Sequence, residues 1–310
     1  MTEAQGGARR GDLALVDAAL CFGGTFLVVQ DAVSRVEPVP FLAVRFSIGA
    51  LALWPLARRR PASAGEWRDG ALGGLALLAG YLLQTTGLQY TDSATSAFIT
   101  YLLVVIVPIL GFVVHRRRPH PATLVGIVVA VVGLVLLTDP GGSRGTGGFG
   151  RGEVLTLGCA VAYAIHLLIL GTTARRHDPV RLAAIQVGLV GVACAGPGLA
   201  MGGYRFPAVA LAAAVGTGLL ATAGAFVLQI SGQRTVAPAR AALLLLLEPV
   251  FAAVLAEARG DGLRLVQLAG GATILAAVII AEALPARLDQ AVRSREAALD
   301  NDRSQGDWVG

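Results

Sequence analysis

The sequence contains no lysine, and charged residues of any kind are scarce. Aspartate, glutamate and arginine make up 15% of the 310 residues, whereas an average soluble domain carries about 25% charge. Without lysine, the chain cannot form a Walker-type phosphate loop, which excludes ATP hydrolysis by such a loop as an energy source. So low a charge content also argues against an ordinary globular enzyme that folds in water.

Cysteine is scarce too, since only Cys21, Cys159 and Cys194 occur. All three lie within apolar runs, and none has the C-x-x-C spacing of a metal-ligand pair. We therefore predict no disulfide framework, no metal site and no cofactor. The glycines at 145, 147 and 150 match a dinucleotide fingerprint as a string. Because they follow an apolar run rather than a strand, they indicate a linker.

Apolar residues are abundant, at 55% of the chain. They are gathered into runs separated by short clusters of Arg, Gly, Pro and Asp, and a bilayer span needs roughly 20 mostly apolar residues. The predicted fold is therefore an all-α polytopic membrane protein with ten transmembrane helices. The predicted spans are 13–30, 40–57, 70–90, 96–114, 121–138, 154–173, 181–202, 208–230, 239–256 and 265–284.

Arginine placement predicts the orientation of these spans. With both termini in the cytoplasm, 18 of the 25 arginines flank spans on the inside and six on the outside, while Arg45 lies within a span. Such an excess marks the cytoplasmic side, so we predict a multi-pass protein of the inner (plasma) membrane with both termini cytoplasmic. The arginines form blocks at span ends rather than one basic surface, and a nucleic-acid partner is not predicted.

The two halves of the chain contain similar segments. Gly80–Gly87 in the third span echoes Gly224–Gly232 in the eighth, with one residue inserted, and Pro108 matches Pro249. Because five spans is an odd number, two such halves must lie in the membrane with opposite orientation, as in many secondary transporters. The predicted divisions are an N-terminal cytoplasmic segment, the first repeat, a Gly-rich linker, the second repeat and a disordered tail, at 1–12, 13–139, 140–152, 153–285 and 286–310.

These segments, together with Phe22-Gly23, Arg45-Phe46, Leu88–Thr91 and Leu247–Ala253, carry a family resemblance. The sequence resembles the EamA-like ten-span members of the drug/metabolite transporter superfamily over nearly its whole length. The resemblance implies an inverted duplication around a central cavity, no ATP-driven motor, and commonly the export of amino acids or related metabolites. Phe22 and Tyr163 depart from the pattern, since the family usually carries tryptophan there.

Glu248 is the strongest candidate for a site residue. It lies near the middle of the ninth span, where an ionisable group is costly unless it faces a partner or a wet cavity. The adjacent Pro249 lacks an amide proton and disturbs the helix at that depth, as Pro108 does in the fourth span. Glu248 is predicted to bind substrate and to couple a proton; the alternative is a local role in holding the kink.

Two further charged residues have alternative interpretations. Arg45 lies a few residues inside the second span, where it either reaches the interface or pairs with a carboxylate in the cavity. Asp17 lies near the inner end of the first span. By position it resembles the acidic residue of small multidrug members of the superfamily, and it is a second candidate for proton coupling; the alternative is contact with cytoplasmic water.

Several uncharged or weakly basic polar residues also fall at membrane depth. The two glutamines occupy matching places in the repeats and either bind substrate or link helices, since interhelical hydrogen bonds need no ligand. The predicted substrate-binding set beyond Glu248 and Arg45 is Gln84, Gln229, Tyr101, Tyr163 and His166.

The function predicted from the sequence is a secondary transporter, an exporter of small metabolites that works by alternating access. The alternatives are an exporter of cationic drugs, a non-transporting membrane sensor and an intramembrane enzyme. No nucleophile elbow, H-E-x-x-H motif or paired aspartates support the enzyme. The predicted partners are a small-molecule substrate and the lipid bilayer, with a second copy of the chain as a further candidate.

Overall fold

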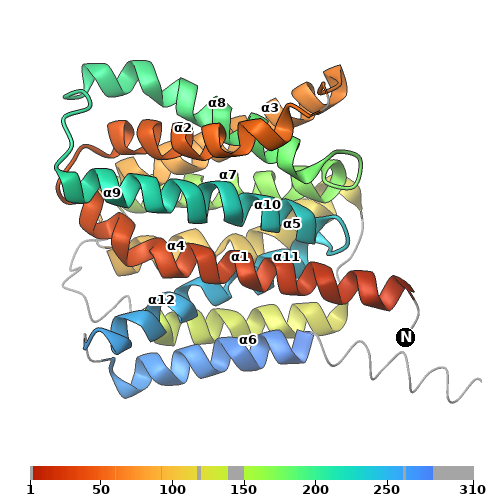
Figure 1. Cartoon of the computed structure of the whole chain (residues 1–310). Helices are drawn as coiled ribbons and strands as arrows, with labels where there is room; N and C mark the ends of the chain where they lie inside the picture. The colour runs from red at the N-terminus through yellow and green to blue at the C-terminus, as the bar shows by residue number, and fades with distance from the viewer. Residues whose placement is uncertain are drawn as a thin grey trace, which may run out of the picture.

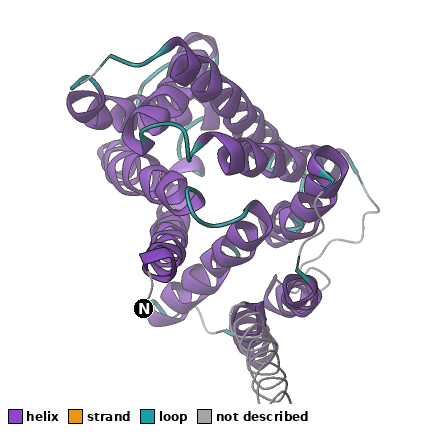
Figure 2. Ribbon diagram, turned by 90° about the vertical axis from the view of Figure 1, so that its right-hand side faces the viewer, coloured by secondary structure: helices purple, strands orange, loops and turns teal. Residues whose placement is uncertain are grey.

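The computed structural model describes residues 3–59, 61–91, 93–116, 120–138, 150–260 and 263–281, and every regular element in these ranges is helical. The helices run side by side as a bundle, which Figure 1 shows from the side and Figure 2 roughly along the helix axes. The elements are α1 (Glu3–Val33), α2 (Pro38–Ala57), α3 (Ala64–Gly87), α4 (Ser93–Tyr101), α5 (Leu103–His115), α6 (Pro121–Thr138), α7 (Arg151–Thr173), α8 (Pro179–Ala200), α9 (Ala208–Thr217), the π-helix η1 (Gly218–Gly224), α10 (Ala225–Gln233), α11 (Pro238–Leu245), α12 (Leu247–Ala258) and a last helix, Leu265–Ala281.

Each range predicted as a span coincides with one helix or with an interrupted series of helices. Within the described residues, seven helical segments are long and apolar enough to cross a membrane. They are 38–57, 95–114, 121–138, 151–173, 179–200, 208–233 and 238–258, and the last helix, Leu265–Ala281, is a shorter apolar one. α1 covers the predicted span 13–30, and α3 covers residues 70–87 of the predicted span 70–90.

The predicted divisions of the chain differ from the helices at two places. α1 already begins at Glu3, so the described part of the N-terminal segment continues directly into the first span. The end of the predicted linker belongs to α7, because Gly150 is its N-cap and the Gly150 amide donates to Glu153 Oε2 at 2.9 Å. The rest of the linker and the predicted tail lie outside the described residues.

Two of the membrane-spanning segments are interrupted near a proline. The helix of 93–115 breaks at Leu102, upstream of Pro108, and the helix of 238–258 breaks at Leu246, just before Pro249. Proline removes a backbone hydrogen bond and pushes its ring against the carbonyl four residues earlier, which explains an interruption on its N-terminal side. Glu248 therefore lies in the first turn after a break.

Long antiparallel contacts bring the two halves of the chain together. A Cβ added at Gly191 of α8 would lie 3.0 Å from the Ser47 amide nitrogen of α2, and one at Gly188 would lie 3.8 Å from Ala50 Cβ. At the bottom of Figure 1, α6 lies beside Leu265–Ala281 in the same manner, with a Cβ at Gly133 only 2.8 Å from the Ile274 nitrogen. Glycine permits this close approach between helices.

One end of the bundle, called here the arginine-rich end, carries the start of α1 and faces the viewer in Figure 2. It is defined by Arg9, Arg10, Arg58, Arg59, Arg68, Arg175, Arg176, Arg181, Arg234 and Arg240. An ion pair joins its separate elements, since Arg240 at the start of α11 contacts Asp12 of α1 at 2.8 Å. The opposite end carries the loops 34–37, 88–91 and 201–207.

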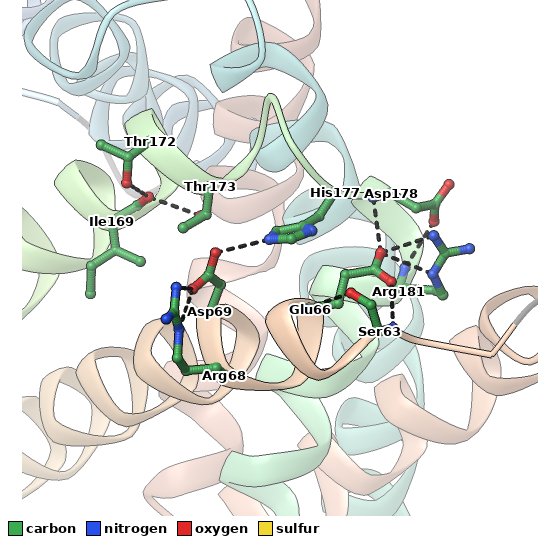
Figure 3. A network of polar contacts seen from close by, with 10 residues as sticks. All are labelled: Ser63, Glu66, Arg68, Asp69, Ile169, Thr172, Thr173, His177, Asp178 and Arg181. Atoms are coloured by element: carbon green, nitrogen blue, oxygen red, sulfur yellow. Dashed lines mark hydrogen bonds and ion pairs between the residues drawn. The ribbon is translucent and has the colours of Figure 1, made fainter.

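A polar network at the arginine-rich end ties the start of α3 to the loop between α7 and α8 (Figure 3). Glu66 accepts hydrogen bonds from the Arg181 guanidinium at 2.9 and 3.0 Å and forms a capping box with Ser63. Asp69 contacts His177 Nε2 at 2.9 Å. Both acids precede the predicted span 70–90, so their charges lie outside it.

Both acids of this network are held in the ionised form. Burial raises the pKa of Glu66, but hydrogen bonds, led by that from Arg181, outweigh it and leave this pKa below its usual value. The hydrogen bond from His177 is the main cause of the lowered pKa of Asp69, helped by the neighbouring Arg68. At neutral pH these carboxylates are therefore ionised and can hold α3 against α7 and α8.

Candidate functional site

Two adjacent chambers lie in the middle of the bundle. A small one of about 130 Å³ and a larger one of about 320 Å³ share six lining residues. The shared residues are Phe22, Tyr81, Gln84, Thr100, Tyr101 and Glu248. All seven predicted substrate-binding residues line one chamber or both, so the structure brings that predicted set together.

Arg45 lines the larger chamber and is only 4% exposed. Its Nε donates to Thr222 Oγ1 at 2.9 Å, which joins α2 to the π-helix η1. Its Cζ lies 5.7 Å from the centroids of both the Phe46 and the Tyr81 rings. A guanidinium held by a hydrogen bond at one nitrogen and by aromatic faces is fixed in direction, and its remaining donors can serve an anion.

Glu248 borders both chambers and is partly buried. It enters the cavity from the first turn of α12, directly after the interruption at Leu246. Tyr101 and Thr100 of α4 line the same two chambers, and Thr100 Oγ1 has no hydrogen-bond partner in the described part of the chain. The region around the carboxylate therefore combines a negative charge with the hydroxyl-bearing side chains of Tyr101 and Thr100.

Aromatic rings form much of the remaining wall. Tyr81 lies edge-on to Phe46 at 4.8 Å and to Tyr163 at 5.7 Å between centroids, and Phe22 lies edge-on to Phe226 at 5.4 Å. Edge-to-face packing of this kind stabilises the arrangement of rings beyond simple burial. The chambers thus combine an apolar wall with a few charged and amide groups.

Gln84 and His166 have partners from other helices. Tyr163 Oη donates to Gln84 Oε1 at 3.3 Å, and His166 Nε2 lies 2.7 Å from Gln186 Oε1. His166 is 2% exposed and Gln186 is 1% exposed. These contacts indicate that both residues also help to hold neighbouring helices together, because each forms a hydrogen bond to a side chain of another helix.

Asp17, the second predicted proton-coupling residue, is not brought to this site. Its side chain is exposed on α1, and it lines neither chamber. Phe22, five positions further along the same helix, faces the cavity instead. Pro108 and Pro249 also lie outside both linings and bear on the site through the helix breaks beside them.

Thr222, Thr100 and Gln186 are polar residues of this region that were absent from the predicted set. The sequence offers a signal for one of them, since Gln186 is an amide at membrane depth. The two threonines carry no such signal, because threonine commonly returns its hydroxyl to the backbone of its own helix. Thr222 lies in the π-helix η1 and accepts its hydrogen bond from Arg45 of another helix.

Comparison of the sequence with known proteins identifies a family. A sequence model of the EamA-like transporter family matches residues 9–139 and again 150–282. A protein of Archaeoglobus fulgidus described as an uncharacterized transporter is 33% identical over 276 residues, which cover 87% of this chain and 84% of that protein. A second one from the same organism, with the same description, is 30% identical and covers 88% and 96%.

A solved structure described only as the crystal structure of a protein has a similar fold. Its TM-score is 0.72 at 21% sequence identity, and the superposition covers 90% of this chain and 98% of that one. At this identity the likeness concerns the fold alone. The double family match and the apolar helices agree that this is a multi-pass membrane protein.

Proposed function

Because this chain belongs to the EamA-like transporter family, we propose that it is a secondary transporter that exports amino acids or related small metabolites by alternating access. One observation carries the choice of substrate: Arg45 and Glu248 line the same central chamber. A positive and a negative group in one chamber match the two charges of a zwitterion.

The chemistry of the two groups supports a zwitterion over a simple cation. An arginine fork binds a carboxylate through short charge-assisted hydrogen bonds, and a glutamate carboxylate binds an ammonium in the same way. A drug carrying only a positive charge would meet Glu248 but would be repelled by Arg45, which is buried and poorly screened. The aromatic wall around Tyr81 and Phe226 suits an apolar or aromatic side chain.

Glu248 also supports coupling to a proton gradient. In the cavity its carboxylate can hold either a substrate ammonium or a proton, and the two compete for one negative charge. A proton taken up on one side then releases the substrate there, which links the two movements. If protons move into the cell along their gradient, this exchange carries the substrate out of the cell. Export is also the direction that the sequence resemblance implies.

Matching glycine contacts at the two ends support an inverted repeat. At the arginine-rich end, a Cβ at Gly232 would lie 2.7 Å from the Gly11 carbonyl oxygen; at the opposite end, one at Gly87 would lie 3.1 Å from the Gly152 oxygen. Gly11 and Gly152 each follow the start of a family match by two residues, and Gly87 and Gly232 close the two repeat segments. The contact between the two repeats at one end of the bundle thus has a counterpart at the other end, with the roles of the repeats exchanged. This is the symmetry expected of an inverted-repeat carrier that works by alternating access.

The orientation follows from the charges. We propose that the arginine-rich end faces the cytoplasm, in agreement with the positive-inside rule. The start of α1 and the polar network of Figure 3 then lie on the cytoplasmic side. The loops 34–37, 88–91 and 201–207 lie outside.

Transport by the wild-type protein tests this function. Proteoliposomes should take up radiolabelled amino acids faster than protein-free liposomes do, and a proton gradient should increase the flux. The measurement is initial flux for a panel of amino acids, with and without a pH gradient across the membrane, and with a cationic dye as the comparison substrate. Flux of the dye without flux of any amino acid would contradict the proposal.

A further inference from the structure

The cavity extends unequally toward the two ends of the bundle. From Glu248 the larger chamber follows α1, α2 and α3 to Val33, Ser34 and Leu88, at the end opposite the arginine-rich one. Toward the arginine-rich end, the smaller chamber stops at His166 and Leu167. The structure thus has a path from the site in one direction and packed side chains in the other.

A compact contact closes the arginine-rich side. The side chain of Gln233, at the end of α10, has no exposed surface, and its Nε2 donates to the Leu167 carbonyl of α7 at 2.9 Å. A few residues later, Pro238 at the start of α11 packs so closely on α7 that a Cβ added at Gly171 would collide with its ring. Gln233 and Pro238 therefore hold the 234–237 turn against α7.

In the first half of the chain, the positions that correspond to Gln233 and Pro238 form no such closure. Leu88 follows Gly87 as Gln233 follows Gly232, and Ala97 precedes Pro108 by the same interval as Pro238 precedes Pro249. Leu88 and Ala97 both line the larger chamber. The same pair of positions thus closes the cavity at one end and borders open space at the other.

The contact at Gln233 is suited to repeated opening. Its Oε1 has no hydrogen-bond partner within the described residues, and an unsatisfied buried acceptor reduces the net stability of the closed arrangement. A closure in a two-state carrier must be weak enough to exchange with its open form. A fully satisfied network would hold the end shut more firmly.

We propose that Gln233 and Pro238 form the inner closure of the transport path, seated on α7 at Leu167 and Gly171, and that Leu88 and Ala97 close the outer side in the opposite state. The inference rests on the proposed alternating-access function and adds to it the residues that seal each end. In the arrangement described here, the site is open toward the side opposite the arginine-rich end.

Spin-label distances test the closure without requiring substrate. In a background whose three native cysteines are replaced by serine, one label pair is attached through Arg175→Cys and Arg234→Cys, and a second through Ser34→Cys and Gln89→Cys. All four positions are exposed. Gln233→Ala, which removes both the hydrogen bond and the side-chain volume, should increase the share of molecules with a longer 175–234 distance about tenfold. The 34–89 distance should shorten in the same molecules.

The control is Gln267→Ala. Gln267 also donates its amide to a helix carbonyl, that of Leu137 at 3.4 Å, but away from the closure, so neither distance should change. Gly171→Ala provides a second variant if Gln233→Ala does not fold, and it should act in the same direction. A change confined to the 175–234 pair, or no change at all, would overturn the closure. Either result leaves the flux test of the function unaffected.

Discussion

Glu248→Gln should lower amino-acid flux about 10- to 100-fold and remove its dependence on a proton gradient. Glutamine keeps the shape of the side chain but can neither hold a negative charge nor take up a proton. Losing a charge-assisted hydrogen bond to the substrate ammonium costs about 1.5–3 kcal/mol, which corresponds to the expected reduction in flux. The measurement is initial flux in proteoliposomes at equal protein content, with and without a pH gradient.

A matched control for this variant is Glu257→Gln. Glu257 is carried by the same helix, α12, but its side chain is exposed and lines neither central chamber. Flux by this variant should equal that of the wild type. If Glu248→Gln keeps both its flux and its response to the gradient, the carboxylate takes no part in transport and the coupling mechanism is wrong.

Arg45→Lys should raise the KM for amino acids about tenfold, with a much smaller effect on the maximal rate. Lysine keeps the positive charge but loses the planar fork that binds a carboxylate through two parallel hydrogen bonds. It also loses the Nε contact to Thr222 that fixes the direction of the guanidinium. The measurement is the concentration dependence of flux for the variant and the wild type.

Arg58→Lys is the corresponding control, because Arg58 directly follows α2 and its side chain is exposed. Its KM should not change. Thermal unfolding in detergent separates a binding effect from a folding defect, since Arg45 is buried and supports two helices. An unchanged KM in a well-folded Arg45→Lys variant would assign Arg45 a structural role.

The positions of the helices could be predicted well from the sequence, for a physical reason. A bilayer demands long apolar runs with internally satisfied backbones, and the breaks at Arg58 and at Pro207 end those runs plainly. The interruptions near Pro108 and Pro249 follow from the missing amide proton of proline. Each of the ten predicted ranges contains helix, but within the described residues seven segments are long and apolar enough to cross a membrane, so the count of ten stays a prediction.

The direction in which each side chain points was harder to predict. In a membrane helix both faces are apolar, so the pattern of hydrophobic residues does not reveal which face borders the cavity. Asp17 illustrates the problem: it precedes Phe22 by five residues, about 140° around the helix. Phe22 faces the cavity, and Asp17 is exposed.

Contacts that depend on tertiary packing could not be predicted at all. The π-helix that contains Thr222, the partner of Arg45, has no sequence signature of its own. The hydrogen bond from Gln233 to the Leu167 carbonyl depends on how α10 packs against α7. The network of Figure 3 had a partial signal. Ser63 and Glu66 form the S-x-x-E pattern of a capping box before an apolar run, but nothing in it indicated Arg181 as a partner.

The central claim is that Arg45 and Glu248 bind opposite charges of one substrate, and ligand binding to the purified wild-type protein tests it most directly. Calorimetry would compare phenylalanine with its methyl ester, which lacks the carboxylate, and with 3-phenylpropionate, which lacks the ammonium. We predict that each analogue binds at least about tenfold more weakly than phenylalanine, because each leaves one buried charge without its partner. Equal affinity for phenylalanine and either analogue would contradict the claim.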